Sequence, residues 1–506
     1  MDKSKTLGTE SVFRLLVHYT IPAVIGMLVQ VMYNIVDGIF VGKFVGPDGL
    51  AAVTLVFPLG VLSPACGMLV GVGCSSIISM LLGQRKIVEA ERVLGNSIFL
   101  LLCVFAILAV LSFSFGHYFV GREGVTEEVV EMATNYLYIT MAFAIFPGVA
   151  YGLNNVIRVQ GNPRTAMATL LVGSVLNTIL DPLFICVFNW GVSGAAWATV
   201  VSQAVACVWV IVFMRRKRSL LKLTLKNIRF SLETTKPVLK IGLAPFLIQI
   251  VACFQGLLLV SQLAFYGEKF FSVHGSDVAV SIWGITFRVG MVVFMVIIGI
   301  YQGMQPIIGY NYGAKQFFRV KKATLQGILL AVFWCTSCWL VMMFFTDDVV
   351  RIFTKSEGQF SSVSTEKITQ KMEEEAVKSQ MIKEEAPFAL RMALCMMPLI
   401  GFQVISSHYF QAVGKPGLSI FLSLSRQVLI LIPTIWCFPL IWGIRGIWYA
   451  FAFSDFISAG ITAIFLRREM RVLDNLQAGK ENAAILNELP GGGEMESPAP
   501  TEANYF

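Results

Sequence analysis

QGNPRTAM, residues 160–167, is repeated as VGKPGLSI at residues 413–420, and this repeat decides the expected fold. VSGAAWAT at 192–199 likewise returns as IRGIWYAF at 444–451. The two pairs are offset by 253 and 252 residues, almost the same distance along the chain. Self-similarity at a constant offset is the signature of a duplicated structural unit, so we expect two related halves.

Each half consists of apolar runs long enough to cross a bilayer. The 506 residues are 56% hydrophobic and 14% charged, whereas a soluble domain has roughly 45–50% apolar and about 25% charged residues. A helix of ~20 apolar residues spans the ~30 Å hydrocarbon core of a membrane. The runs predict twelve transmembrane helices, near residues 15–41, 50–80, 93–117, 132–156, 164–188, 192–214, 237–265, 278–307, 323–346, 388–411, 416–440 and 443–466.

A basic loop at 215–236 divides these spans into two sets of six. We therefore expect an all-α polytopic membrane protein with an N-lobe, residues 1–214, and a C-lobe, residues 237–471. Because six is even, both lobes enter the membrane in the same orientation, so a pseudo-twofold axis along the membrane normal should relate them around a central cleft. The polar segment 355–386 is expected as an external insert, and the tail 472–506 as disordered on its composition.

Basic residues indicate which loops face the cytoplasm. They follow the even-numbered spans, as Arg85, Lys86 and Arg92 follow the second span and Arg158 and Arg164 the fourth. The positive-inside rule places these loops, and both termini, in the cytoplasm. The net charge of +8 then reflects topology and no nucleic-acid partner. We expect a monomeric, multi-pass protein of a bacterial plasma membrane whose partners are lipids and small molecules.

Several classes of chemistry find no support in the sequence. There is no GxxxxGK[ST] motif for a nucleotide-driven motor, so transport would depend on an ion gradient. An intramembrane enzyme is a weak alternative, because neither HExxH nor a paired Ser/His arrangement is evident. The cysteines lie within apolar runs and the histidines near span ends, without metal-ligand spacing. We expect no enzyme activity, no cofactor and no structural metal.

Four separated motifs resemble those of the multidrug and toxic compound extrusion (MATE) family. They are YNIVDGIFVGKFVGPDGLAAV at 33–53, GQRK at 83–86, QGNPR at 160–164 and GYNYGAK at 309–315. The resemblance covers roughly residues 10–470 and best fits the DinF-like branch, because the intramembrane acids lie in the N-terminal half. It implies a secondary active multidrug exporter that exchanges amphipathic, often cationic compounds for H⁺ or Na⁺ by alternating access.

Carboxylates inside a membrane are the first candidates for function, because burying a charge there is costly. Asp37 lies in the first span, with Gln30 and Tyr33 on the same helical face. Asp181 lies in the fifth span, one helical turn after Asn177. Two nearby carboxylates at low dielectric cannot both ionise cheaply, so together they should hold a proton or share Na⁺ through oxygen ligands.

The family resemblance implies the composition of this site. Asp37, Asn177 and Asp181 match the cation or proton site of the N-lobe in MATE proteins, and Thr199 matches the hydroxyl that accompanies it. Gln30, Tyr33 and Asn154 are the expected supporting polar residues. The alternative is that both acids only hydrogen-bond to neighbouring helices and hold the bundle together.

The C-lobe offers fewer acids. Its seventh and tenth spans contain glutamines, namely Gln249, Gln255 and Gln403, but no Asp or Glu. Asp455 in the twelfth span either binds a cation or pairs with an arginine. Arg288 and Arg426 are either structural partners or cavity-lining charges. In the second case they favour a rival function, a flippase for lipid-linked saccharides, which needs a strongly cationic cavity to hold pyrophosphate.

The surface that contacts the substrate is expected between the lobes. Methionine adapts to varied shapes, and aromatic faces attract cations. The candidates with these properties, together with one glutamine, are Met27, Phe57, Phe287, Met291, Phe294, Met295 and Gln403.

Overall fold

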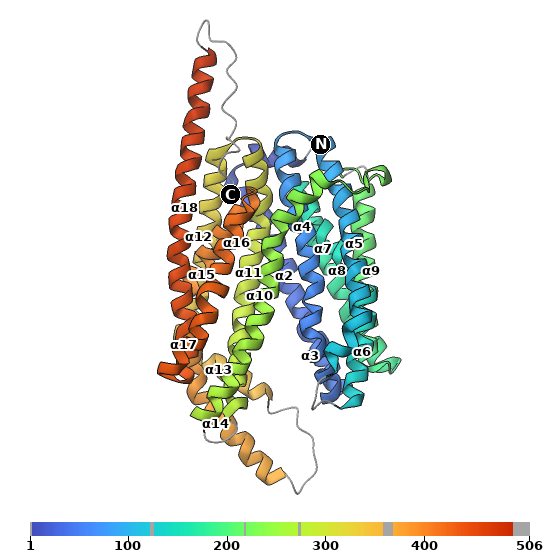
Figure 1. The fold of residues 1–506 in the computed structure, drawn as a ribbon, viewed down its shortest axis with the longest axis vertical. Helices are drawn as coiled ribbons and strands as arrows, with labels where there is room; N and C mark the ends of the chain where they lie inside the picture. Colours follow the sequence, from blue (N-terminus) through green and yellow to red (C-terminus); the bar gives the residue numbers. More distant parts are fainter. Residues whose placement is uncertain (1–2, 122–125, 217–218, 272–274, 358–367, 489–506) are drawn as a thin grey trace.

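The computed structural model describes residues 3–121, 126–216, 219–271, 275–357 and 368–488. These residues form helices joined by short loops, without any strand (Figure 1). Ten helices are long and apolar enough to cross a membrane, and two bent helix pairs bring the number of spans to twelve. The predicted all-α, twelve-span fold is confirmed.

The first six spans begin after two short helical turns, η1 (Lys3–Lys5) and α1 (Thr6–Thr9). Proline and glycine interrupt several of these spans, which accounts for the paired labels. The helices are α2 (Val12–Phe44), α3 (Pro47–Gly60) with α4 (Leu62–Gly83), α5 (Ile87–Val120), α6 (Glu127–Ala142) with α7 (Ile145–Val159), α8 (Pro163–Pro182) with the π-helical turn η2 (Leu183–Val187), and α9 (Gly191–Arg215).

The other six spans follow the turn η3 (Leu225–Asn227). Two of them are also interrupted, one by a bend of 43° between α14 and α15 and one by a π-helical segment, η4. The helices are α10 (Leu232–Phe270), α11 (Gly275–Gly313), α12 (Phe317–Phe344), α13 (Thr346–Glu357), α14 (Ile368–Ala393) with α15 (Met397–Ala412), α16 (Pro416–Leu424) with η4 (Ser425–Leu431) and α17 (Ile432–Trp442), and α18 (Ile444–Glu488).

Two segments differ from the sequence-based expectation. The expected insert 355–386 is not a separate element, because its described residues end α13 and begin α14, which continues toward the membrane; residues 358–367 lie outside the described part. Disorder from residue 472 is wrong as far as Glu488, because α18 continues to that residue. Leu473 is buried and Asp474 pairs with Lys321 of α12 at 2.7 Å, which holds this turn of α18 against the bundle.

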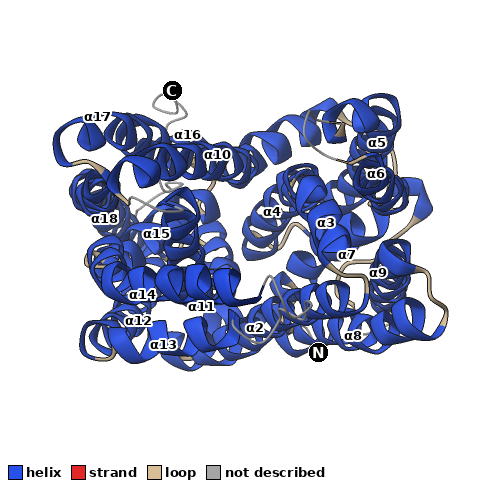
Figure 2. Ribbon diagram, turned by 90° about the horizontal axis from the view of Figure 1, so that it is seen from below, coloured by secondary structure: helices blue, strands red, loops and turns tan. Residues whose placement is uncertain are grey.

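The two halves meet through two equivalent helix contacts and through a contact between α4 and α11. α2 packs against α11, and α10 packs against α4 (Figure 2). Glycine permits both approaches: a Cβ on Gly303 would collide with the backbone of Thr20, and one on Gly73 with the backbone of Val238. Since Gly73 and Gly303 occupy matching places in the second span of each half, the contacts are exchanged by a pseudo-twofold operation.

The lobes contact each other in the half of the bundle that contains the N-terminus. There Gln305 of α11 donates to the hydroxyls of Ser75 and Ser76 on α4 at 3.1 and 2.8 Å. Toward the opposite end α2 and α10 diverge (Figure 1), and Met32 and Phe57 expose more than half of their side-chain surface. The backbones of the two lobes therefore separate toward the end away from the N-terminus.

Candidate cation site in the N-lobe

Asn177 links α8 to α9 in a buried polar cluster. Its amide nitrogen donates to the carboxylate of Asp181 at 3.2 Å and lies 3.4 Å from the hydroxyl of Thr199. Asn177 and Asp181 are buried, and Thr199 is partly buried. The four-residue spacing on α8 places both α8 side chains on the face that packs against α9. Asn177 therefore lies within hydrogen-bond distance of two of the other three predicted site residues, Asp181 and Thr199.

Asp37 approaches this cluster from α2, which packs against α8. It is close enough to Asp181 for the two carboxylates to interact electrostatically. One oxygen of Asp37, one of Asp181 and the amide oxygen of Asn177 are buried without a hydrogen-bond donor among the described residues. Buried acceptors without donors are unfavourable, so this arrangement is stabilised by whatever supplies a proton or a cation.

No described lysine or arginine forms an ion pair with Asp37 or Asp181. The described residues also contain no group of three or more His, Cys, Asp or Glu side chains suited to a transition metal. What remains is a set of carboxylate, amide and hydroxyl oxygens. Such oxygens suit a proton or a hard cation such as Na⁺.

Tyrosines surround the two acids. Tyr33 of α2 and Tyr136 of α6 are both close enough to Asp37 and Asp181 to interact with them electrostatically. Sequence reasoning selected Tyr33 but missed Tyr136, because a tyrosine within an apolar run has no signal that separates a polar role from packing. Tyr136 reaches the site only because α6 and α9 pack together.

A pocket lies one helical turn from the acids, between α2, α7, α8 and α9. Its polar lining includes the predicted residues Gln30 and Tyr33 together with Tyr151, Ser174 and Gln203. The expected supporting residue Asn154 is not in this lining: its amide donates to the carbonyl of Ala166 at 2.7 Å and ties α7 to α8.

The predicted substrate residues are dispersed. Met27 is buried where the lobes meet, next to Gln302 of α11. Phe57 and Phe287 are exposed, at 64% and 52%. Met291, Phe294 and Met295 are partly buried along α11, and Gln403 is buried on α15 with its amide oxygen lacking a donor. The structure does not gather them into one described pocket.

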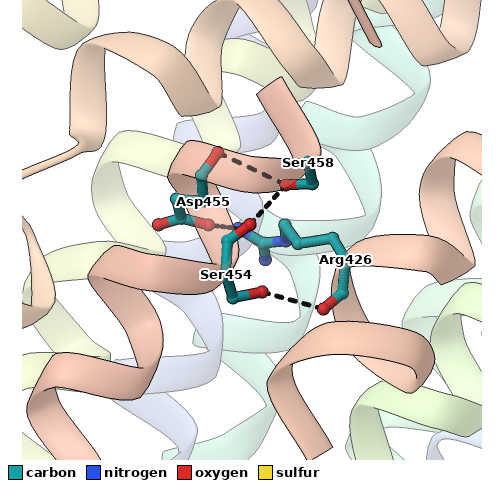
Figure 3. Close-up of polar contacts among 4 residues, drawn as sticks. All are labelled: Arg426, Ser454, Asp455 and Ser458. Atoms are coloured by element: carbon teal, nitrogen blue, oxygen red, sulfur yellow. Dashed lines mark hydrogen bonds and ion pairs between the residues drawn. The ribbon is translucent and has the colours of Figure 1, made fainter. Parts of the chain in front are cut away.

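The C-lobe acid has a partner. The guanidinium of Arg426 in η4 donates to the carboxylate of Asp455 in α18 at 2.8 Å, and Ser454 donates to the Arg426 carbonyl at 2.9 Å (Figure 3). Of the two alternatives for Asp455, the structure contains the pairing. Arg288 on α11 is exposed and has no carboxylate partner within the described ranges.

Comparison with known proteins agrees with this architecture. The MatE family model matches residues 22–183 and 258–437, more than half of the chain. The multidrug export protein MepA of Staphylococcus aureus (strain N315) is 25% identical over 465 residues, which are 92% of this chain and 96% of that protein. MepA of Staphylococcus saprophyticus is 26% identical over 469 residues, with the same coverage.

Solved structures show the same arrangement of helices. A transporter of the MOP superfamily from Pyrococcus furiosus, described as having a binding pocket of reverse polarity that suggests a different function, superposes with a TM-score of 0.82 at 27% identity. The match covers 93% of this chain and 98% of that one. A MATE transporter in a bent conformation superposes with a TM-score of 0.83 at 25% identity, over 94% and 99% of the two chains. The chain therefore belongs to the MATE family and is a membrane transporter, not an enzyme.

Proposed function

We propose that this transporter exports amphipathic, mainly cationic compounds in exchange for H⁺ or Na⁺, with Asp37 as the coupling residue and Asn177, Asp181 and Thr199 completing the ion site. The observation that carries the proposal is the set of three buried oxygens without donors, contributed by two acids and an amide. The MepA relatives are named multidrug export proteins, which supports export of several different compounds.

The proposed cycle depends on the electrostatic repulsion between the two carboxylates, Asp37 and Asp181. A proton or Na⁺ that enters through the open end neutralises Asp37 and removes its repulsion with Asp181. α2 then repacks toward α8, which disfavours bound substrate and favours the arrangement open at the other end. Release of the ion inside restores the charged site, so ion entry and drug exit are linked. Pro22 interrupts the hydrogen bonding of α2 and makes such bending less costly.

The membrane orientation is part of the proposal. With the N-terminus in the cytoplasm of a bacterium, as the positive-inside rule predicts, the end at which the lobes separate would face outward and admit external ions. The proposed transporter acts as a monomer, because each chain contains both lobes and the cleft between them.

A saccharide flippase is less well supported. The flippase requires several uncompensated cations in the cavity, whereas Arg426 is paired with Asp455 at 2.8 Å. Arg288 alone is a weak site for a pyrophosphate group, which several charge-assisted hydrogen bonds usually hold. We therefore favour drug export.

Reconstituted protein tests the proposal and identifies the ion. Uptake of a fluorescent organic cation would be measured in liposomes under an imposed pH gradient, an imposed Na⁺ gradient, or neither. We expect uptake with one gradient and little without any. Equal uptake under all three conditions would contradict ion-coupled export.

A further inference from the structure

The Arg426–Asp455 pair occupies a definite place in the internal repeat. Gly161 and Gly414 have positive φ values of 89° and 77° in the loops that precede α8 and α16, and their positions differ by 253 residues. The same shift takes Gly173 to Arg426. The ion pair therefore has one member at the C-lobe equivalent of Gly173.

The N-lobe equivalent of Asp455, the second member of the ion pair, is found from the loop that precedes the last span of each half. Gly191 and Gly443, with φ values of 55° and 58°, precede the last span of each half and differ by 252 residues. This shift takes Gln203 to Asp455. Gly173 and Gln203 also face each other in the N-lobe, because a Cβ on Gly173 would lie 3.8 Å from the Gln203 amide nitrogen. The two lobes thus juxtapose the same two positions, with uncharged residues in one and an ion pair in the other.

The uncharged version of this arrangement is a pocket. Gly173, Ser174 and Gln203 line the N-lobe pocket next to the coupling acids. In the C-lobe Arg426 stands at the position equivalent to Gly173, and its long side chain extends to Asp455 at 2.8 Å. Its side chain is 18% exposed and that of Asp455 is 5% exposed. The guanidinium group of Arg426 therefore occupies the carboxylate of Asp455 as an external guanidinium ligand would.

The internal repeat places two further hydrogen-bond acceptors, the amide oxygens of two glutamines, in the region of the Arg426–Asp455 pair. Ala150 and Ser174 line the N-lobe pocket, and the 253-residue shift takes them to Gln403 and Gln427. Gln403 is only 3% exposed, and the amide oxygens of both glutamines are buried without a donor among the described residues. α15, which carries Gln403, packs against α16 and α18. Acceptors in excess of donors favour a ligand that is rich in N–H groups.

We infer that Asp455, Gln403 and Gln427 form a substrate site in the C-lobe. There the guanidinium or amidinium group of a hydrophobic cation displaces Arg426 from Asp455. This inference rests on the proposed export of cationic compounds and specifies the chemical group that the C-lobe recognises. A planar cation with several N–H donors can donate two parallel hydrogen bonds to one carboxylate. A quaternary ammonium or phosphonium cation has no N–H donor and cannot do so.

Binding measured without any gradient tests the inference separately from ion coupling. Octylguanidinium and tetraphenylphosphonium would be titrated calorimetrically into the purified full-length protein. In Arg426→Gln the internal competitor is lost, so we expect octylguanidinium to bind at least about tenfold more tightly. In the double variant Arg426→Gly/Asp455→Gln, which copies the N-lobe residues, this gain should vanish. Tetraphenylphosphonium, which has no N–H donor, should bind equally to all three proteins.

A gain in affinity in Arg426→Gln that is absent from the double variant distinguishes a binding site from a purely structural ion pair. Equal octylguanidinium affinity in Arg426→Gln and the double variant would overturn the inference. If Arg426→Gln does not yield folded protein, Arg426→Lys retains the charge with fewer donors and should still bind octylguanidinium more tightly than the wild type; unchanged affinity there would also overturn it. Lys321→Gln/Asp474→Asn, which removes a cytoplasmic-end ion pair of the same lobe, serves as the control and should leave both ligands unaffected.

Discussion

The two lobes treat a buried acid in opposite ways. In the N-lobe, Asp37 and Asp181 approach each other and no described cation neutralises them, whereas Asp455 of the C-lobe is paired with Arg426 at 2.8 Å. The shift that takes Thr20 to Val238 also takes Asp37 to Gln255, so the C-lobe lacks an acid at that place. Duplication has thus retained the helix packing while the polar interior has diverged.

This comparison separates two uses of charge. An acid without a fixed counter-ion can take up and release a mobile one, which is what coupling to a gradient requires. An acid that is paired with an arginine holds two helices together, and a cation could bind it only by displacing that arginine. We therefore propose that the N-lobe couples transport to the ion and that the C-lobe recognises N–H-rich cations.

The largest expected effect on stability concerns the paired acid. Asp455→Asn leaves the guanidinium of Arg426 buried without a counter-charge, which typically destabilises a protein by about 3–5 kcal/mol. Asp181→Asn removes a charge that has no described counter-ion and should have a much smaller effect. Thermal unfolding of both purified variants checks this contrast. A similar loss of thermal stability in the two variants would remove the distinction between the lobes.

A smaller effect should appear where the lobes meet. Gly73→Ala and Gly303→Ala each insert a methyl group into the backbone of the opposing lobe, and overpacking of this kind costs about 1–3 kcal/mol. Because the two contacts are equivalent, both variants should shift the transporter toward the arrangement open at the N-terminal end. Labelling of a cysteine placed between the lobes measures this shift.

Gly256→Ala on α10 is the control for the glycine variants, because a Cβ there has open space around it. It should leave the labelling rate unchanged. If Gly73→Ala and Gly303→Ala change the labelling in opposite directions, the pseudo-twofold equivalence of the contacts is wrong.

The hydrogen bonds of the amide at the proposed ion site should contribute a comparable amount. Asn177→Leu removes the donor to Asp181 and Thr199, and a lost hydrogen bond to a charged group is worth about 1.5–3 kcal/mol. We expect a weaker affinity for the coupling ion, seen as a higher ion concentration for half-maximal transport, and a protein that remains folded. Unchanged ion dependence would exclude Asn177 from the site.

The smallest effect belongs to a surface contact. Asp474→Asn breaks the partly exposed ion pair with Lys321, and such pairs contribute about 0–1 kcal/mol. Transport should be unchanged, and thermal stability should fall slightly at low salt. A loss of transport would show that the long helix α18 takes part in the conformational cycle through its C-terminal end.

Much of this architecture was readable from the sequence. Apolar run lengths gave the spans, and the repeated loop motifs gave the duplication, because both depend on local sequence. The four-residue spacing of Asn177 and Asp181 placed two site residues on one helical face, and the family resemblance added Thr199. In the structure Asn177 contacts both Asp181 and Thr199.

Other features depend on contacts between distant residues. Pairing of Asp455 with an arginine was one of two alternatives in the sequence. Arg426 was not identified as the partner, because the chain alone does not show that η4 and α18 face each other. Tyr136 near the acids and Asn154 on the Ala166 carbonyl also follow from helix packing. The helix beyond residue 472 was missed because its polar composition suggested disorder, while the burial of Leu473 stabilises it.

The most direct measurement is gradient-driven transport by Asp37→Asn in liposomes, with Asp48→Asn as the matched control. Asp48 is an exposed acid in the same hairpin, outside the ion site. Asparagine resembles the protonated acid in shape and charge, so Asp37→Asn should be produced and folded like the wild type, bind substrate, and transport none of it against a gradient. Asp48→Asn should transport normally. Full transport by folded Asp37→Asn would contradict the coupling role of Asp37.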